Sequence, residues 1–331
     1  MINKLTYIIS TETNPYRNLA LEEHLLKNVG DEECILYLWQ NERTIVIGKN
    51  QNPWKECRIA ELVADDGKLV RRLSGGGAVF HDLGNLNFTF VVARDNYHVT
   101  KQLEVILEAV KQRGIPAENT GRNDISVEGR KFSGNAFYTD GQHCYHHGTI
   151  LVNVDMSMLS HYLNVSRDKL ISKGVESVRS RVANLCEYDC NLTIEGMKQG
   201  LLDAFGTVYG QKPQNIEATR LNFAEIELLE SKFSSWDWIY GKKMEFNYSM
   251  SQRFSWGDVD LKLEIQSGMI NACVIYSDSL EIEVFEKLSE ALAGVPFTSF
   301  AMVNVIENMK TTNEAMMILK DIAQLITCEN I

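Results

Sequence analysis

Three consecutive glycines separate two strand-like segments at residues 71–81, RRLSGGGAVFH. Two arginines and a serine precede the glycines, and an apolar stretch follows them before His81. An ordered glycine costs about 0.5–1 kcal/mol relative to alanine in a regular element, so three in a row indicate a need for bare backbone. We therefore predict a loop that follows a strand, KLVRR, and precedes another, LNFTFVVA at 86–93.

The glycine run matches neither common nucleotide-binding loop. No stretch provides G-x-x-x-x-G-K-[ST], and Gly48-Lys49 lacks both the earlier glycine and the following hydroxyl residue. The dinucleotide pattern G-x-G-x-x-G fails because Phe80 occupies its last glycine position. Bare amide groups beside arginines can instead form a nest for a phosphate or a carboxylate. A flexible hairpin or a bulge is the alternative for this stretch.

Composition narrows the class of protein. The chain has 331 residues, enough for one large domain or two unequal ones. Its apolar runs are strand-sized, and the amino-terminal segment has no apolar signal region, so we expect a cytoplasmic protein without membrane spans. The net charge of −11 argues against nucleic acid as a partner. Seven scattered cysteines do not suggest a disulfide framework.

Local signals predict mixed α+β structure before residue 244. Asn14-Pro15 is a helix start for YRNLALEEHLL, whose Leu19, Leu25 and Leu26 would face the core. CILYLWQ and TIVIG read as two strands joined by a hairpin turn at residues 41–43. Further helices are expected at 102–114, 193–206 and 223–235. Strands DISV, RKFSGNAFY and HHGTILVNV are separated by turns at 128–129 and 140–141.

The pattern changes near residue 245. Three successive strands, with a turn at Ser267-Gly268, are followed by helical EIEVFEKLSEALAG and NEAMMILKDIAQLI. This order suggests a small α+β domain of its own. We therefore expect a larger domain at residues 1–243 and an accessory domain at 244–331.

Three other stretches contain residues suited to chemistry. Lys131 lies near Ser133-Gly134 in a predicted strand, where a glycine often marks the close approach of a ligand or backbone, although a lone lysine is usually solvent-facing. Asp124 and His147 could hold Mg²⁺, whereas His146 and His147 would point to opposite faces of a strand and do not predict a zinc site. The basic stretch KGVESVRSRVANL is a mobile phosphate-binding loop or an ordinary solvated one.

Seven ordered segments together resemble the bacterial lipoate–protein ligase A family. They are NPYRNLALEEHLL, LYLWQNERTIVIGKNQNPWKE, RRLSGGGAVFHDLGNLNFTF, GRNDISVEGRKFSGNAFY, HHGTILVNVDMSML, KGVESVRSRVANL and SSWDWIYGK. The resemblance covers most of residues 1–241 and implies the biotin/lipoyl ligase-like α+β fold. The residues after it resemble the accessory domain of the family.

The resemblance implies an ATP-dependent, AMP-forming ligase. Lipoate and ATP would give lipoyl-adenylate and pyrophosphate, with Mg²⁺ as the metal. A lysine of a lipoyl domain, in the 2-oxoacid dehydrogenase complexes or the glycine-cleavage H protein, would then accept the lipoyl group.

The resemblance also implies site residues. Lys131 would be catalytic and would contact both ATP and lipoate. The other expected ATP contacts are Arg72, Gly77, Ala78, Val79, Phe80, Ser177 and Arg179. The other expected lipoate contacts are Arg71, Ser74, Gly75, Gly76, His81, Asn85, Ser133 and Gly134. The metal candidates remain Asp124 and His147.

Other functions stay open at this point. Octanoyl and lipoyl transferases of the same superfold use a cysteine thioester, and the segment after HHGTILVNVDMSML contains no cysteine. A lipoyltransferase that uses preformed lipoyl-adenylate is not separated by these motifs. The G-R-G-R-x-x signature of biotin ligases is absent. A non-catalytic binder of lipoate or lipoyl domains is a further alternative, although Lys131 and the glycine run are intact.

Overall fold

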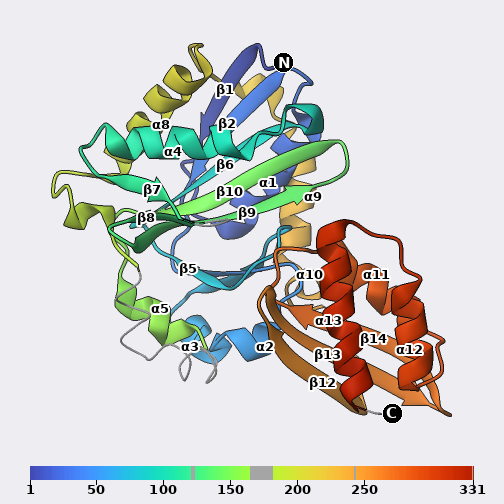
Figure 1. Cartoon of the computed structure of the whole chain (residues 1–331). Coiled ribbons are helices and arrows are strands. Elements are labelled where there is room, and N and C mark those ends of the chain that lie inside the picture. Colours follow the sequence, from blue (N-terminus) through green and yellow to red (C-terminus); the bar gives the residue numbers. More distant parts are fainter. Residues whose placement is uncertain (121–123, 165–181, 242–243, 330) are drawn as a thin grey trace. The chain divides into compact units, whose positions relative to one another are not determined.

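The computed structural model describes residues 1–120, 124–164, 182–241, 244–329 and 331. The chain divides into two compact units. The first comprises Met1–Val46, Trp54–Arg71 and Val79–Ile239, and the second comprises Ile47–Pro53, Arg72–Ala78 and Tyr240–Ile331. Both units mix helices and strands, as the α+β prediction required (Figure 1).

An eight-stranded sheet forms the centre of the first unit, in the order β11-β1-β2-β6-β10-β9-β8-β7. Its strands are β1 (Lys4–Ile9), β2 (Glu33–Trp39), β6 (Asn85–Ala93), β7 (Ala117–Asn119), β8 (Asp124–Val127), β9 (Arg130–Thr139), β10 (His143–Leu151) and β11 (Gln214–Asn215). β1 pairs in parallel with β2 and β11, and the other neighbours are antiparallel.

Helices cover both faces of this sheet. α4 (Val99–Lys111) and α8 (Ile194–Tyr209) lie on one face (Figure 1). They share one core with the apolar residues of β2, β6, β8 and β10. α1 (Pro15–Asn28) contacts β2, β6 and β10 and packs on α9 (Phe223–Ser234). The side chain of Asn14 caps α1, and Leu19, Leu25 and Leu26 are buried, which confirms that part of the sequence prediction.

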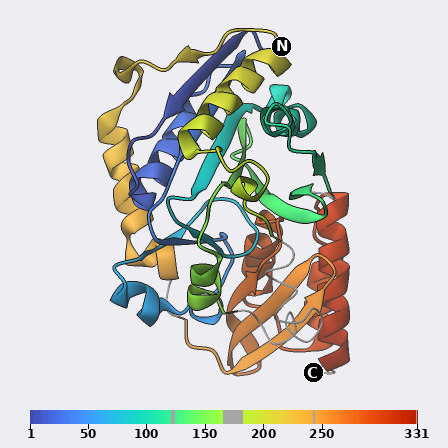
Figure 2. The same cartoon turned by 90° about the vertical axis from the view of Figure 1, so that its left-hand side faces the viewer.

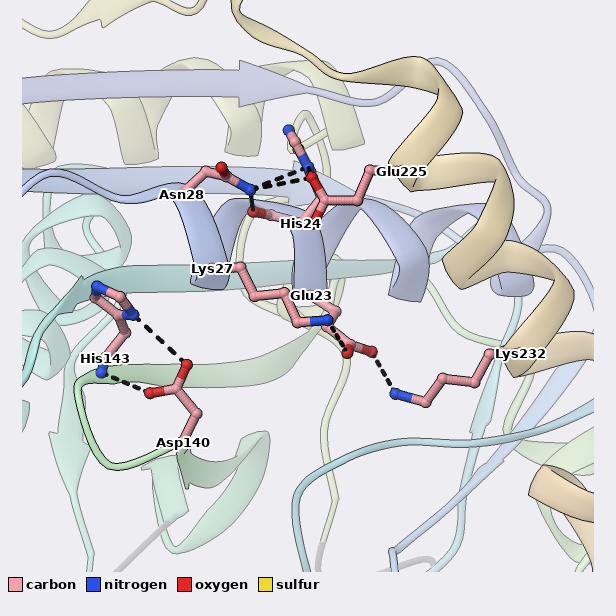
Figure 3. Close-up of polar contacts among 8 residues, drawn as sticks. All are labelled: Glu23, His24, Lys27, Asn28, Asp140, His143, Glu225 and Lys232. Carbon is pink, nitrogen blue, oxygen red and sulfur yellow. Dashed lines mark hydrogen bonds and ion pairs between the residues drawn. The ribbon is translucent and has the colours of Figure 1, made fainter.

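Ion pairs fasten α1 to α9 (Figure 3). The Glu23 carboxylate lies 2.6 Å from Lys232 Nζ and 2.8 Å from Lys27 Nζ. Nδ1 of the buried His24 lies 2.8 Å from Glu225 Oε2. The polar side of α1 is therefore held by the neighbouring helix, and its other side is left to face the sheet.

A smaller sheet in the order β4-β3-β5 contains β3 (Thr44–Ile47), β4 (Lys68–Arg71) and β5 (Val79–His81). The predicted hairpin at residues 41–43 is wrong, because β2 pairs with β1 and β6 while β3 pairs with β5. The segment between them passes from one sheet to another, which local turn chemistry does not reveal. The strand β1, the short β5 and α12 were not predicted either.

Short helices complete the first unit. They are α2 (Pro53–Glu56), α3 (Ile59–Ala64), α5 (Met156–Tyr162), α10 (Trp236–Tyr240) and the 3₁₀ turns η1 (Arg94–Asn96), η2 (Leu185–Glu187) and η3 (Ala218–Arg220). The predicted turn at Asp140 is confirmed: its carboxylate accepts hydrogen bonds from the backbone N–H groups of Gln142 and His143, at 2.9 and 2.7 Å. Figure 3 shows Asp140 beside His143 at this turn between β9 and β10.

The second unit has its own sheet and its own core. β12 (Tyr248–Phe254), β13 (Gly257–Gln266) and β14 (Met269–Ser277) form an antiparallel meander. α11 (Glu283–Leu292), α12 (Ser299–Glu307) and α13 (Asn313–Glu329) bury their apolar side chains with it. Figure 2 shows the ribbons of these strands and helices in orange to red. Across the parts of both units that the structure describes, no helix is long and apolar enough to cross a bilayer.

Candidate active site

One face of the large sheet is polar where the other is apolar. On β6, Leu86, Phe88, Phe90 and Val92 belong to the core beneath α4 and α8. Successive side chains of a strand point to opposite faces, so Asn85, Asn87 and Thr89 of the same strand face the other side. All three are buried, although their side chains are polar. A strand that is buried on both faces but polar on one is suited to surround a ligand.

The strand register places five residues in one row on this polar face. Asp124 of β8 pairs with Gly134 of β9, and Asn87 of β6 pairs with both Thr149 of β10 and Trp39 of β2. The Gly134 N–H donates to Thr149 Oγ1 at 3.3 Å, which joins the two halves of the row. The row therefore runs directly across five neighbouring strands.

Lys131 lies at the Asp124 end of this row. Its Nζ is 2.6 Å from Asp124 Oδ1, and each side chain is 38% exposed. A Cβ on Gly134 would lie 2.9 Å from the same Nζ and 3.0 Å from Cε. The sequence predicted that a ligand or backbone approaches this glycine closely. In the structure, the group that approaches Gly134 is the side chain of Lys131. Ser133, by contrast, is fully buried opposite Ile125 of the core.

A buried polar network occupies the neighbouring row. Trp39 Nε1 donates to Thr89 Oγ1 at 3.1 Å, and Thr89 Oγ1 donates to Glu22 Oε1 at 2.7 Å. The same Glu22 oxygen lies 2.9 Å from His147 Nδ1. Sequence analysis missed Glu22. The available signal was its position three residues after Leu19, which places a carboxylate on the inward side of α1.

The two expected metal candidates therefore have different partners. His147 contacts Glu22, and Asp124 contacts Lys131. Within the described ranges, no group of three or more His, Cys, Asp or Glu side chains is placed to hold a metal ion. Mg²⁺ in nucleotide sites often uses only one or two carboxylates together with phosphates and waters. The half-exposed Asp124 carboxylate fits that kind of ligand better than an imidazole does.

His146 points to the opposite face from His147, as the sequence predicted. It is enclosed by aromatic rings, with Phe88, Phe90 and Phe137 at centroid distances of 5.3, 6.0 and 5.0 Å. Burial, together with the charge of His147, lowers the pKa of His146 to about 3. A histidine with this pKa is neutral at pH 7 and acts as a core residue.

His81 and Arg71 also belong to the first unit. His81 is buried, with Nδ1 3.3 Å from Asn41 Nδ2 and its ring 6.2 Å from that of Trp39. The Arg71 guanidinium donates to the carbonyl oxygens of Trp238 and Ile239 at 2.6–3.0 Å. Arg71 is thereby tied to the backbone of α10, which is formed by the WDWIY part of the SSWDWIYGK segment.

The glycine run belongs to the second unit up to Ala78. The Arg72 guanidinium donates to Ser74 Oγ and to the carbonyl oxygens of Gly75 and Gly77, at 2.7–3.1 Å. The Gly76 N–H donates to Ser279 O at 2.9 Å. The Arg72 side chain and the backbone of Gly75–Gly77 are therefore held together by hydrogen bonds in one loop.

Two of these glycines differ in what surrounds them. A Cβ on Gly75 would meet the carbonyl oxygens of Ser279 and Leu280 at 2.5 and 2.7 Å, so no side chain fits there. A Cβ on Gly77 would have no atom within 4 Å. Among the remaining expected contacts, Phe80 is buried in β5 against Tyr162, and Ser177 and Arg179 lie outside the described residues.

Five of the seven cysteine thiols are poor nucleophile candidates. Burial raises the pKa of Cys34, Cys57 and Cys273 to about 12 and also raises that of Cys144 and Cys186. A nucleophilic cysteine needs the opposite shift, because the thiolate is the reactive form.

Comparison with known proteins identifies the family. The model of the lipoyl protein ligase A/B catalytic domain matches residues 14–206, and that of the bacterial lipoate protein ligase C-terminus matches 243–326. The chain belongs to the lipoate–protein ligase family. A lipoate-protein ligase A of Psychrobacter cryohalolentis is 41% identical to this ligase over 302 residues, which are 89% of each chain.

Solved structures of the family share the fold of this ligase. Plasmodium falciparum LipL1 in complex with lipoate is 31% identical, with a TM-score of 0.86 over 97% of this chain and 98% of that one. A bipartite ligase of Thermoplasma acidophilum, described with its E2 lipoyl domain, is 26% identical, with a TM-score of 0.64 over 74% and 99%. A lipoate-protein ligase A bound with ATP is 25% identical, with a TM-score of 0.62 over 73% and 99%.

Within the first unit, the ligase brings several expected residues onto one sheet face. Asp124 and Gly134 share a row, and Lys131, His147 and Asn85 lie on the same face at other positions. Ser133 instead faces Ile125, and Arg71 faces α10. The expected contacts from Arg72 to Ala78 belong to the second unit, whereas Val79 and Phe80 lie on β5 of the first unit.

Proposed function

We propose that this ligase activates lipoate with ATP to form lipoyl-adenylate and transfers the lipoyl group to a lysine of an acceptor protein. The observation that carries the proposal is the placement of Lys131: its ammonium lies over Gly134, on the polar face of a sheet in a chain of this family. A fixed cation at that place suits a reaction in which negative charge develops on phosphorus oxygens.

In the first step, a lipoate carboxylate oxygen attacks the α-phosphorus of ATP and pyrophosphate leaves. Lys131 stabilises the charge on the α-phosphate, and Arg72 with residues 77–80 positions the nucleotide. In the second step, the amine of the acceptor lysine attacks the lipoyl carbonyl carbon and AMP leaves. Lys131 can polarise that carbonyl as well.

The other expected contacts keep their assigned roles in this proposal. Ser177 and Arg179 would complete the nucleotide site. The acyl side would be formed by Arg71, Ser74, Gly75, Gly76, His81, Asn85, Ser133 and Gly134. Asp124 would hold Mg²⁺ with the ATP phosphates, and His147 is the second candidate ligand.

Lipoyl domains of E2 subunits and the glycine-cleavage H protein are the proposed acceptors. The Thermoplasma relative described with its E2 lipoyl domain supports this kind of partner. We also propose that residues 1–243 carry both half-reactions and that 244–331 act as an accessory domain. The match of a separate carboxyl-terminal family model to residues 243–326 supports that division.

Thioester transfer without ATP is the main alternative. It would require an activated thiol, whereas burial raises the pKa of Cys144, the cysteine nearest in sequence to the HHGT segment. Cys144 also belongs to the apolar core beneath α4 and α8, on the face opposite to His147. These observations favour adenylation over thioester chemistry.

Pyrophosphate exchange tests the proposal directly. Purified protein should exchange labelled pyrophosphate into ATP only when lipoate and Mg²⁺ are both present. A panel of acids, including octanoate, would define the acyl specificity. Acyl transfer from a carrier protein without any such exchange would falsify the adenylation step.

A further inference from the structure

Two neighbouring carboxamides on β6 are incompletely hydrogen-bonded. Asn85 and Asn87 are buried, at 0% and 1% exposure. Asn85 Nδ2 donates to Asn87 Oδ1 at 3.0 Å. The other two amide atoms, Asn85 Oδ1 and Asn87 Nδ2, have no hydrogen-bond partner among the residues that the structure describes. A buried polar atom without a partner costs about 1–3 kcal/mol, so the arrangement calls for an explanation.

Both carboxamides lie on the face that carries Lys131. Asn87 is directly opposite Thr149, whose hydroxyl accepts from Gly134, and Gly134 lies beneath the Lys131 amine. Two strand spacings separate β6 from β9, about 10 Å between backbones. Asn85 is the next residue along β6 on this face, on the side of Asn87 away from Thr89 and its network with Glu22. The pair thus lies on the same face as Lys131, two strands away from β9.

The free atoms define the chemistry of a matching ligand. One is a donor and the other is an acceptor. Turning both carboxamides over exchanges the roles of Asn85 and Asn87 but again leaves one donor and one acceptor. A carboxylate offers acceptors only and would leave the free amide oxygen unsatisfied. A carbonyl oxygen beside an N–H group satisfies both atoms.

We infer that Asn85 and Asn87 bind the two groups that are joined when the amide forms. This inference rests on the proposed function. It adds Asn87, which no motif had singled out, to the residues that bind the reacting groups. The free amide N–H of the pair donates to the oxygen of the lipoyl carbonyl, and the free amide oxygen accepts from the N–H of the attacking lysine amine. The pair stabilises the charge on the carbonyl oxygen in the transfer step, whereas Lys131 and the nucleotide contacts stabilise the charge on phosphate in adenylation.

The step is balanced without another reactant. The amine nitrogen forms a bond to the carbonyl carbon, and the electron pair of the C=O bond moves to oxygen. As the carbonyl re-forms, the bond from carbon to the phosphate oxygen breaks and AMP leaves with that electron pair. The nitrogen releases one proton to water. A donor aimed at the oxygen stabilises the charge that it carries in between.

Separate measurement of the half-reactions tests the inference. Adenylation is followed by lipoate-dependent pyrophosphate exchange, and transfer by single turnover of preformed lipoyl-adenylate with an acceptor lipoyl domain. Asn87→Asp keeps the shape but replaces the donor by an acceptor. It should slow transfer by about 10²-fold, as loss of one oxyanion donor does. Pyrophosphate exchange should fall clearly less than transfer, because only transfer builds up charge on the carbonyl oxygen that the lost N–H would stabilise.

Asn96→Asp is the matched control. Asn96 is also a buried asparagine of the first unit, but its Nδ2 donates to Asp31 O at 2.6 Å, outside the row. This variant should leave both half-reactions unchanged. If Asn87→Asp does not unfold cooperatively, Asn87→Ser decides by the same comparison, and its transfer should again be slowed more than its pyrophosphate exchange.

Three results would overturn the inference. They are an unchanged transfer rate, equal losses in exchange and transfer, and a raised ATP requirement in exchange. The last would assign the carboxamides to adenine, which also offers a donor beside an acceptor. Failure of the proposed function would look different, because the wild type itself would then neither exchange pyrophosphate nor use lipoyl-adenylate.

Discussion

Lys131 Nζ lies 2.6 Å from Asp124 Oδ1. The two residues are not paired across β8 and β9, because the register shifts at a bulge between Ile125 and Ser126. The pair is half-exposed, so it is open to exchange with a ligand. An anionic phosphate can replace Asp124 as the partner of the ammonium, and the released carboxylate can then meet a cation. One ion pair therefore connects the proposed catalytic residue with the proposed metal ligand.

Replacing Lys131 by alanine should abolish adenylate formation and leave the fold intact. The side chain is 38% exposed, so its removal opens no core cavity. We expect lipoate-dependent pyrophosphate exchange to fall by about 10³-fold, the scale of a lost electrostatic contact in a transition state. Lys287→Ala is the control, since Lys287 also forms a 2.6 Å ion pair, with Glu283 of the second unit. Near-normal exchange by Lys131→Ala would remove Lys131 from the catalytic role.

Asp124→Asn should raise the Mg²⁺ concentration needed for half-maximal exchange by about tenfold or more, because a neutral amide is a weaker ligand for a hard cation. The readout is a Mg²⁺ titration at saturating ATP and lipoate. Glu128→Gln, on the adjoining turn, removes one exposed carboxylate as a control. A lower maximal rate with an unchanged Mg²⁺ midpoint would mean that Asp124 only positions Lys131. His147→Gln, titrated in the same way, tests the second metal candidate.

Arg72→Ala should raise the KM for ATP more than the KM for lipoate. Arg72 donates to the carbonyls of Gly75 and Gly77, so the substitution removes both a charge and the brace of the loop. We expect a rise in the KM for ATP of about tenfold or more, the effect of losing a charged hydrogen bond. A larger effect on lipoate would show that the roles assigned to Arg71 and Arg72 are exchanged.

Two glycine variants should separate stability from nucleotide binding. Gly75→Ala would drive a methyl group against the carbonyls of Ser279 and Leu280, so we expect a loss of about 1–3 kcal/mol in the free energy of unfolding. Gly77→Ala meets no atom within 4 Å and should unfold like the wild type. Since Gly77 is a proposed ATP contact, its variant should instead weaken ATP binding. Denaturant unfolding and ATP titration of both proteins check this, and equal stability of the two would contradict it.

His146 should make stability depend on pH below neutrality. Its pKa is about 3 in the folded chain and about 6.5 when unfolded, so the unfolded chain binds one more proton between these values. The stabilisation is complete above pH 6.5 and is lost as the pH falls, by about 1.4 kcal/mol per pH unit from this group.

His146→Gln removes this titration while keeping hydrogen-bonding capacity. The variant should be less stable at pH 7 by about 1–3 kcal/mol, because it loses the aromatic contacts. Its stability should fall less steeply between pH 6.5 and pH 4 than that of the wild type. Parallel slopes in urea unfolding over this range would show that His146 does not titrate with unfolding.

Local sequence was sufficient where the physics is local. Asn14-Pro15 predicted the start of α1 because a capping side chain and a fixed proline φ act within one turn. Asp140-Gly141 predicted its turn for the same reason. The alternation of β10 separated His146 from His147 because successive side chains of a strand point to opposite faces.

Pairing between distant segments could not be predicted in the same way. The residues at 41–43 have the composition of a hairpin turn, yet the strands on either side of them enter different sheets. Glu22 reads as one of two adjacent acids on a helix, and only the packing of α1 on β6 and β10 brings it to Thr89 and His147.

The sequence alone determined the family of this protein and most of its helices and strands. It also identified the lysine and the glycines proposed for its chemistry. Motif order and local propensity suffice for this, because both depend only on residues that are near one another in the sequence. Only the tertiary structure decided which side chains share a face. The row from Asp124 through Gly134, Thr149 and Asn87 to Trp39 joins the consecutive strands β8, β9 and β10 to β6 and β2, which lie earlier in the chain. Its register is fixed by burying the opposite face against α4 and α8, since a slip of one residue would turn every polar side chain into that core.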